Sequence, residues 1–360
     1  MPNFIDKLVL KVQEKADKLS QTLRSDAEAK EEALRQLLER HWHPLPQDIT
    51  AMKRPDRPVF AIDGSMRRAN LANGAYLFVA QALIIGEGIE DTAVEVEILP
   101  GSTRRSSVER FADLLLQSLE VGLARDNVDK LPQGSILFLD GALYGQLPQL
   151  YPLTIEGTPY SFPEEILAAY LYLFQRCRKR DIRLISIAKT SRDALLSRIL
   201  QESEGLSPIL DIPDSEMLYR WTDGRAGYST PVILGRWGFT RGSQELLRRA
   251  EVRNASAIVS FFVRLSDFDD AVRVDLPAFC VGSDTRLGEV KGDILDHRTV
   301  GEILQMLAGD YGGMEVYNAL LYSVDREVRL ERRMMKDVYL KLIERELGCE
   351  IRLSRSERRF

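Results

Sequence analysis

Two acidic residues each follow a run of apolar side chains and precede a glycine. Asp63 comes after four apolar residues (59–62) and before Gly64, and Asp140 comes after four more (136–139) and before Gly141. Such runs suit buried strands, and an Asp-Gly pair suits the turn where a strand ends. If the two strands are neighbours, their carboxylates lie together at one sheet edge and can bind a divalent cation. The alternative for each pair is a turn without chemical function.

The composition is that of an ordinary globular protein. Of 360 residues, 44% are hydrophobic and 29% are charged, and the formal net charge is −5. This balance does not indicate general binding to polyanions, so a nucleic-acid function would need a local basic surface. Cys177, Cys280 and Cys349 lie far apart without CxxC spacing, which fits a reducing compartment. With no signal-peptide pattern and no apolar run of about 18 residues, we expect a cytoplasmic protein that does not bind membranes.

The histidines do not predict a metal site. His41 and His43 flank Trp42, but Pro44 and Pro46 follow at once and disfavour a regular element. We therefore expect a linker with a packed Trp42. The remaining histidine is His297, so a histidine zinc site is not expected.

The hydrophobic pattern predicts an α/β fold. Two helices are expected within residues 4–40, the second with Ser25 as its N-cap. Strands at 59–62, 75–85 and 93–99 form an antiparallel meander, and a helix with Ser106 or Ser107 as N-cap carries Glu109 in its first turn. The later elements alternate: a strand at 135–140, a helix at 164–180, a strand at 182–188, a helix at 194–200, strands at 257–265 and 272–277, and helices at 299–308 and 317–338.

This order of elements is that of a ribonuclease H-like mixed sheet flanked by helices. The chain is expected to divide into three parts. Residues 1–50 form a helical extension that contacts a partner, and residues 51–345 form a nuclease domain with a loop-rich insertion near 203–242. Residues 346–360 form a basic tail.

In detail the chain resembles the NurA family of DNA-end-processing nucleases. The segments that carry the resemblance are 61–65, 108–110, 138–143, 187–191 and 317–321, together with Asp325, and the match spans roughly residues 57 to 335. The chain departs from the family pattern near its end. Asn318 stands where the family often has proline, and Val324 precedes Asp325.

The resemblance implies a manganese-dependent nuclease, with magnesium as the alternative ion, that acts on DNA ends and on single-stranded DNA. It implies 5′-to-3′ exonuclease and single-strand endonuclease activity in double-strand break repair, by a homodimer that works with a HerA-type hexameric translocase. For two-metal hydrolysis, Asp63 would bridge both ions, Glu109 and Asp140 would each complete one shell, and Asp325 would add to one. Lys189 would contact the phosphate, and Tyr317 would orient the substrate or the attacking water.

Basic residues near the expected site predict a path for DNA. They are Arg104, Arg105, Arg110 and Lys189, with Arg178 and Lys179 as a further cluster. Phosphate contacts of this kind bind without regard to sequence. An ordinary solvated surface is the alternative for each of them.

Two other functions fit parts of the sequence. A NurA-like subunit that stimulates a translocase without cutting is compatible with the altered carboxy-terminal motif. A strand followed by Asp-Gly-Ser also resembles the phosphate loop of actin-like phosphotransferases. That fold needs a second glycine-rich loop, and Gly312-Gly313 is not preceded by an apolar strand.

Overall fold

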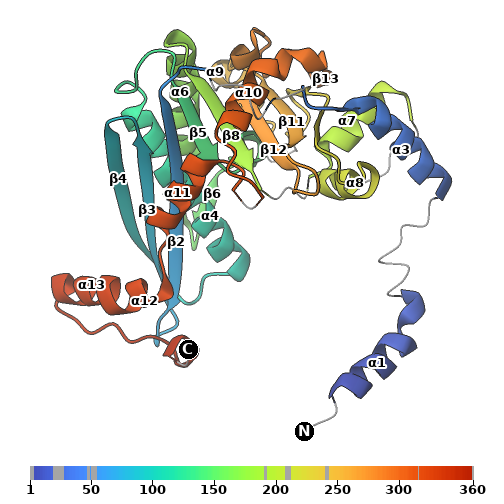
Figure 1. Cartoon of the computed structure of the whole chain (residues 1–360). Helices are drawn as coiled ribbons and strands as arrows, with labels where there is room; N and C mark the ends of the chain where they lie inside the picture. Colours follow the sequence, from blue (N-terminus) through green and yellow to red (C-terminus); the bar gives the residue numbers. More distant parts are fainter. Residues whose placement is uncertain are drawn as a thin grey trace.

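The computed structural model describes residues 4–18, 28–46, 49, 55–189, 193–206, 212–239, 243–314 and 316–358 (Figure 1). Two helices precede the main body, α1 (Phe4–Glu14) and α3 (Glu28–His41). α1 has no buried residue, whereas Leu34, Leu37 and Leu38 of α3 are buried in the core. The predicted N-cap Ser25 lies outside the described residues.

A large mixed sheet with strand order β1-β9-β11-β12-β8-β5-β2-β3-β4 organises the chain (Figure 1). β2 (Val59–Asn70), β3 (Tyr76–Gly86) and β4 (Ile89–Leu99) form the predicted antiparallel meander. β5 (Ile136–Asp140) pairs parallel to β2, and β8 (Arg183–Ala188) pairs parallel to β5. The order β4-β3-β2-β5-β8, with only the middle meander strand reversed, confirms the predicted ribonuclease H-like fold class.

The other half of the sheet contains short strands from distant parts of the chain. They are β1 (Trp42–His43), β9 (Gly227–Ser229), β10 (Val232–Leu234), β11 (Ile258–Arg264), β12 (Val272–Pro277) and β13 (Gly292–Ile294). β6 (Leu153–Ile155) and β7 (Thr158–Tyr160) form a separate hairpin. The expectation of an irregular linker at Trp42 was wrong: Trp42 and His43 pair with β9 before Pro44 can interrupt the ladder. The segment predicted as a loop-rich insertion supplies β9 and β10.

Helices cover both faces of the sheet. On one face, α4 (Arg105–Asn127) packs on Phe60 and Ile62 of β2, and α6 (Phe162–Lys179) packs against α4 and β8. On the other face, α11 (Ala319–Val328) packs on β2, and α10 (Gly301–Gly309) lies in the same core cluster as Val59 and Ala61. The shorter helices are α5 (Leu143–Gln146), α7 (Leu195–Ser203), α8 (Asp214–Trp221) and α9 (Ala250–Arg253). No helix in the described part of the chain is long and apolar enough to span a membrane.

Two predicted helix boundaries need correction. α4 begins at Arg105 after an extended Arg104 that makes no side-chain cap, so neither Ser106 nor Ser107 is its N-cap. The helix predicted at 317–338 is broken. Asn318 caps α11 by accepting a 2.9 Å hydrogen bond from the Leu321 amide, and an extended Arg329 ends the helix. A second helical stretch follows as α12 (Arg332–Met334), a π-helical turn (Met335–Tyr339) and α13 (Leu340–Leu347), before α14 (Arg355–Arg358).

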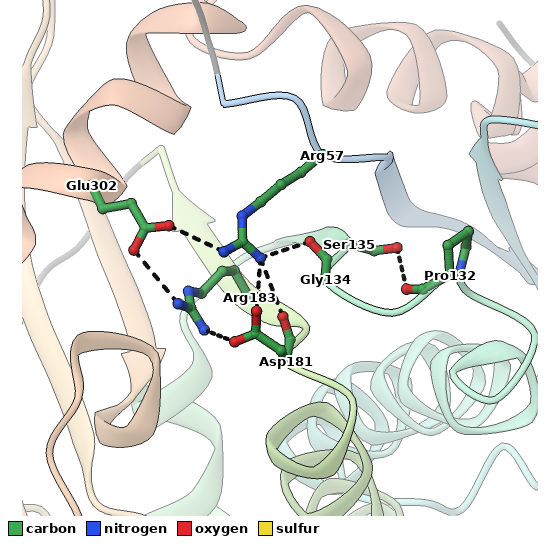
Figure 2. A network of polar contacts seen from close by, with 7 residues as sticks. All are labelled: Arg57, Pro132, Gly134, Ser135, Asp181, Arg183 and Glu302. Carbon is green, nitrogen blue, oxygen red and sulfur yellow. Dashed lines mark hydrogen bonds and ion pairs between the residues drawn. The ribbon is translucent and has the colours of Figure 1, made fainter.

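The amino ends of β2, β5 and β8 are held together by a network of ion pairs (Figure 2). Arg57 lies 3.2 Å from Asp181 and 3.4 Å from Glu302, and it donates a 2.8 Å hydrogen bond to the Gly134 carbonyl. Arg183 lies 2.6 Å from Asp181 and 3.5 Å from Glu302. Two guanidinium groups therefore face two carboxylates, and the charges in this network balance.

Candidate active site

Asp63 lies in the middle of β2 and not at its end. The strand continues to Asn70, and Asp63 pairs with Leu83 of β3, so the predicted turn after Asp63 was wrong. The side chain is only 6% exposed, and its Oδ1 accepts a 2.8 Å hydrogen bond from the Gly64 amide. A buried carboxylate on a central strand is held rigidly, which suits a group that must keep a fixed position.

Asp140 lies beside Asp63, as predicted. β5 ends at Asp140, and the parallel pairing of Ile62 with Leu139 makes the two aspartates neighbours at the next position. Side chains alternate between the faces of a sheet, so Asp63 and Asp140 follow Ala61 and Phe138 toward the face covered by α11. The two acids that the sequence singled out therefore share one side of the sheet.

Two more carboxylates approach from the helices on either face. The negative charge of Asp325 on α11 contributes to the raised pKa of Asp63. From the opposite face, Glu120 of α4 reaches the backbone of Gly64: a β-carbon at position 64 would lie 2.5 Å from its Oε1. Glycine at position 64 therefore leaves room for the Glu120 side chain and does not form a turn.

The carboxylates act on one another strongly. Burial, followed by the charge of Asp140, raises the pKa of Asp63 from its ordinary value of 3.8 to about 7. Burial, followed by the charges of Asp63 and Asp140, also holds the pKa of Glu120 well above its usual range. The site thus carries more negative charge than its own positive groups neutralise, a feature typical of functional sites.

Lys189 and Tyr317 complete the group. Lys189 follows β8, and its Nζ lies 3.1 Å from Asp140 Oδ2 and 5.1 Å from the centre of the Tyr317 ring. Burial lowers the pKa of Lys189, but the charges of Asp140, Asp325 and Asp63 outweigh it and raise the pKa overall. The Tyr317 hydroxyl is buried near Asp140 but makes no hydrogen bond of good geometry among the described residues, and burial, followed by the charges of Asp140, Asp63 and Asp325, raises its pKa. A buried hydroxyl of this kind suits a partner from a ligand or an ordered water.

The structure does not bring Glu109 to this group. Its carboxylate pairs with Arg105 at 2.8 Å, and both side chains are exposed. Glu109 and Glu120 lie 11 positions apart on α4, which corresponds to about 16 Å along the helix. Glu120 occupies the place expected for Glu109. The sequence contained a signal for it, because Gln117 and Glu120 are polar residues three positions apart between the apolar positions of α4.

The predicted basic residues divide into two groups. Arg110 lines a groove of about 1020 Å³ that runs along α4 to Glu120, and its guanidinium lies 3.3 Å from the centre of the Tyr151 ring. Arg104 and Arg105 are exposed at the start of the same helix. Arg178, which pairs with Asp284, and Lys179 lie where α6 leads into the amino end of β8. Because Lys189 follows the carboxyl end of β8, the structure does not bring these last two residues to the site.

The donor set fits a hard divalent cation. Four carboxylates and a buried hydroxyl offer only oxygen atoms, which Mg²⁺ and Mn²⁺ prefer. In the described part of the chain, no three acidic, histidine or cysteine side chains are arranged to hold an ion as they stand. Burial and then the neighbouring charges raise the pKa values of Asp63 and Glu120, and a bound cation would relieve the repulsion between these charges.

Comparisons with known proteins agree with the fold. The model of the NurA domain matches residues 57–330, most of the 360-residue chain, so the protein belongs to the NurA family. The crystal structure of the NurA nuclease from Sulfolobus solfataricus is similar over 97% of this chain and 98% of its own, with 18% identity and a TM-score of 0.59. A NurA structure bound to dAMP and manganese covers 92% and 97%, with 13% identity and a TM-score of 0.60.

A further NurA structure with manganese covers 94% of this chain and 98% of its own, with 13% identity and a TM-score of 0.55. No curated protein matches the chain. At these identities the structural likeness shows the fold, and the family model shows the membership. The predicted resemblance is thereby confirmed, and the homology supports a nuclease function.

Proposed function

We propose that the protein is a divalent-metal-dependent DNA nuclease that hydrolyses phosphodiester bonds. The observation that carries this proposal is the convergence of Asp63, Asp140, Glu120 and Asp325 from two strands and two helices around the carboxyl end of β5. Manganese in related NurA structures supports the choice of ion. When bound, two Mn²⁺ or Mg²⁺ ions would activate the attacking water and stabilise the charge of the leaving oxygen.

The residues of the chain have separate roles in this proposal. Asp63, Asp140, Glu120 and Asp325 would hold the ions, with Asp63 fixed by its place on a central strand. Lys189 would hold the phosphate next to Asp140 and offset its negative charge. The Tyr317 hydroxyl would donate a hydrogen bond to a phosphate oxygen, which gives its buried oxygen a partner. Glu109, which pairs with Arg105, would have no part in the cleavage step.

The finer activities rest on family membership. We propose 5′-to-3′ exonuclease and single-strand endonuclease activity on DNA ends in double-strand break repair. The protein would act in the cytoplasm as a homodimer together with a HerA-type hexameric translocase. Residues 1–50 would serve as the contact region, since six large apolar side chains of α1 are exposed. The nuclease domain would span 51–345 with its insertion near 203–242, and the tail 346–360 would lie outside it.

Cleavage of end-labelled DNA tests the proposal. Wild-type protein with Mn²⁺ should shorten the end-labelled DNA. Asp63→Ala and Asp140→Ala should abolish cleavage while the circular dichroism spectrum and the oligomeric mass in solution remain those of the wild type. Cleavage that survives in either variant would move the centre elsewhere. A wild type that is inert with Mn²⁺ and Mg²⁺, even with a translocase present, would favour the non-cutting scaffold.

A further inference from the structure

A second cleft is lined by Lys189, whose amino group also pairs with Asp140. It has a volume of about 670 Å³ and lies between α8 and the turn that joins β11 to β12. Two aromatic side chains line it, Tyr219 on α8 and Phe268 in the turn, and their exposed fractions are 81% and 80%. Large aromatic rings that bury so little contribute little to folding, so their presence in one cleft calls for another explanation.

Phe268 is held in an unfavourable backbone conformation. Its φ is 65°, in the left-handed region that glycine favours and that bulky residues avoid. Its amide donates a 2.7 Å hydrogen bond to the Gly224 carbonyl, and a β-carbon at Gly224 would lie 2.8 Å from the phenyl ring. Strain that is maintained at an exposed ring points to function and not to packing.

A buried arginine fixes both walls of the cleft. Arg264 is 4% exposed and donates hydrogen bonds to the Asp269 carbonyl at 2.7 Å and to Thr222 Oγ1 at 2.6 Å. The first bond holds the turn that carries Phe268, and the second holds the end of α8, which carries Tyr219. The two rings therefore project from a rigid frame, and stacking on them would cost little conformational entropy.

The charge of the cleft favours bases over phosphates as the bound groups. Three cations and three carboxylates line the cleft, and two of the cations, Lys189 and Arg220, pair with Asp140 and Glu216 outside it. A duplex, which is recognised mainly through its phosphates, would gain little here. An unpaired strand exposes the faces of its bases, and these stack on aromatic side chains without regard to sequence.

We propose that this cleft is the entry path of single-stranded nucleic acid, with bases stacked on Tyr219 and Phe268 and the backbone leading to Lys189. The inference rests on the proposed nuclease function, because Lys189 joins the cleft to the carboxylate site. The two rings position the strand and take no part in bond cleavage.

Binding of a fluorescent oligothymidylate in Ca²⁺, measured by anisotropy, tests the assignment without cleavage. Phe268→Gly should keep the fold, since glycine suits the backbone at φ 65°, and should weaken binding about fivefold or more. Tyr219→Ala should have a similar effect. Tyr172→Ala, which removes a tyrosine on α6 outside the cleft, is the matched control and should bind as the wild type does.

An oligothymidylate with consecutive abasic positions completes the test. The wild type should bind the abasic strand more weakly than the intact one. The two cleft variants should bind both strands equally, because they lack a ring on which the bases could stack. Unchanged binding of intact oligothymidylate by Phe268→Gly and Tyr219→Ala would overturn the inference and assign the rings to a protein partner. Ring-dependent binding by a protein that cleaves nothing would uphold the inference while the proposed nuclease function failed.

Discussion

The parallel strands β2, β5 and β8 carry two groups of charged side chains. In the first group the positive and negative charges are equal in number, and in the second the negative charges are in excess. At the amino ends, Arg57 and Arg183 face Asp181 and Glu302 at distances of 2.6–3.5 Å (Figure 2). At the carboxyl ends of β5 and β8, Asp140 lies against Lys189, and beside them, in the middle of β2, burial and neighbouring charges raise the pKa of Asp63 to about 7.

The first group of charges stabilises the sheet, whereas the second group suits a functional site. Paired charges at the amino ends hold three strands and α10 together. Because they already neutralise one another, they offer little binding energy to a charged ligand. Unbalanced charges at the carboxyl ends raise the free energy of the folded chain, and a divalent cation would lower it again. We therefore expect changes at the amino ends to affect stability alone, and changes at the carboxyl ends to affect activity and stability in opposite directions.

The largest expected effect separates the two glutamates of α4. Glu120→Gln should lower the rate of Mn²⁺-dependent cleavage by about 100-fold or more, since loss of a charge that holds the ions forfeits several kcal/mol of transition-state stabilisation. Glu109→Gln, on the same helix, should change the rate less than about twofold, because its carboxylate pairs only with the exposed Arg105. Initial rates on end-labelled DNA measure both. A larger loss for Glu109→Gln would contradict the placement of the site.

Asp63→Asn should inactivate the protein and also stabilise it. Removing the buried charge should raise the free energy of unfolding of the metal-free chain by about 2–4 kcal/mol at pH 8, from the shift of its pKa. Urea denaturation in the presence of EDTA measures this. Addition of Mn²⁺ should reverse the order, because only the wild type gains from binding. A metal-free variant less stable than the wild type would show that Asp63 is structurally satisfied.

The raised pKa of Asp63 predicts how stability depends on pH. Between about pH 4 and pH 7 the folded metal-free chain keeps a proton that the unfolded chain has released. The unfolded state then binds fewer protons, so the contribution of Asp63 to the free energy of unfolding falls as pH rises through this window. Mn²⁺ competes with the same proton, and its affinity should rise with pH up to about 7. Calorimetric titration at pH 6 and pH 8 measures the affinity for Mn²⁺, and equal affinities at the two pH values would refute the prediction.

The smallest effect is expected at the amino ends. Glu302→Gln should lower the free energy of unfolding by about 1 kcal/mol, because the carboxylate is 44% exposed and solvent screens its pairs with Arg57 and Arg183. Thermal denaturation measures the loss, and cleavage at a temperature where both proteins are folded should be unchanged. A substantial loss of activity would show that the two ends of the strands are coupled.

The sequence predicted the elements more accurately than their ends. The apolar runs before Asp63 and Asp140 identified two core strands, and the family resemblance placed them next to each other. The continuation of β2 through Gly64 could not be predicted, because it depends on pairing with β3, and Asp-Gly alone favours a turn. The start of α11 was missed because Asn318, read as a departure from the family pattern, acts as the N-cap.

The acid on α4 shows how far local sequence can specify a site. Glu109 stands in the first turn of its helix, where acidic residues are common for reasons of the helix dipole. Glu120 stands among apolar residues, where a charge is unfavourable without a function. Which of the two meets Asp63 depends on where α4 crosses β2, and that crossing is fixed by packing on Phe60 and Ile62. Tertiary geometry therefore decided between two residues that both fitted the local pattern.

The location of bound Mn²⁺ shows whether Asp63, Asp140 and Glu120 form the metal site. Crystals grown with Mn²⁺ and measured near its absorption edge should show anomalous density between Asp63, Asp140 and Glu120, with Asp325 nearby. The amino-end network of Arg57, Asp181, Arg183 and Glu302 should show none. Density at Glu109, or none between Asp63 and Asp140 in an active preparation, would contradict this placement of the metal site.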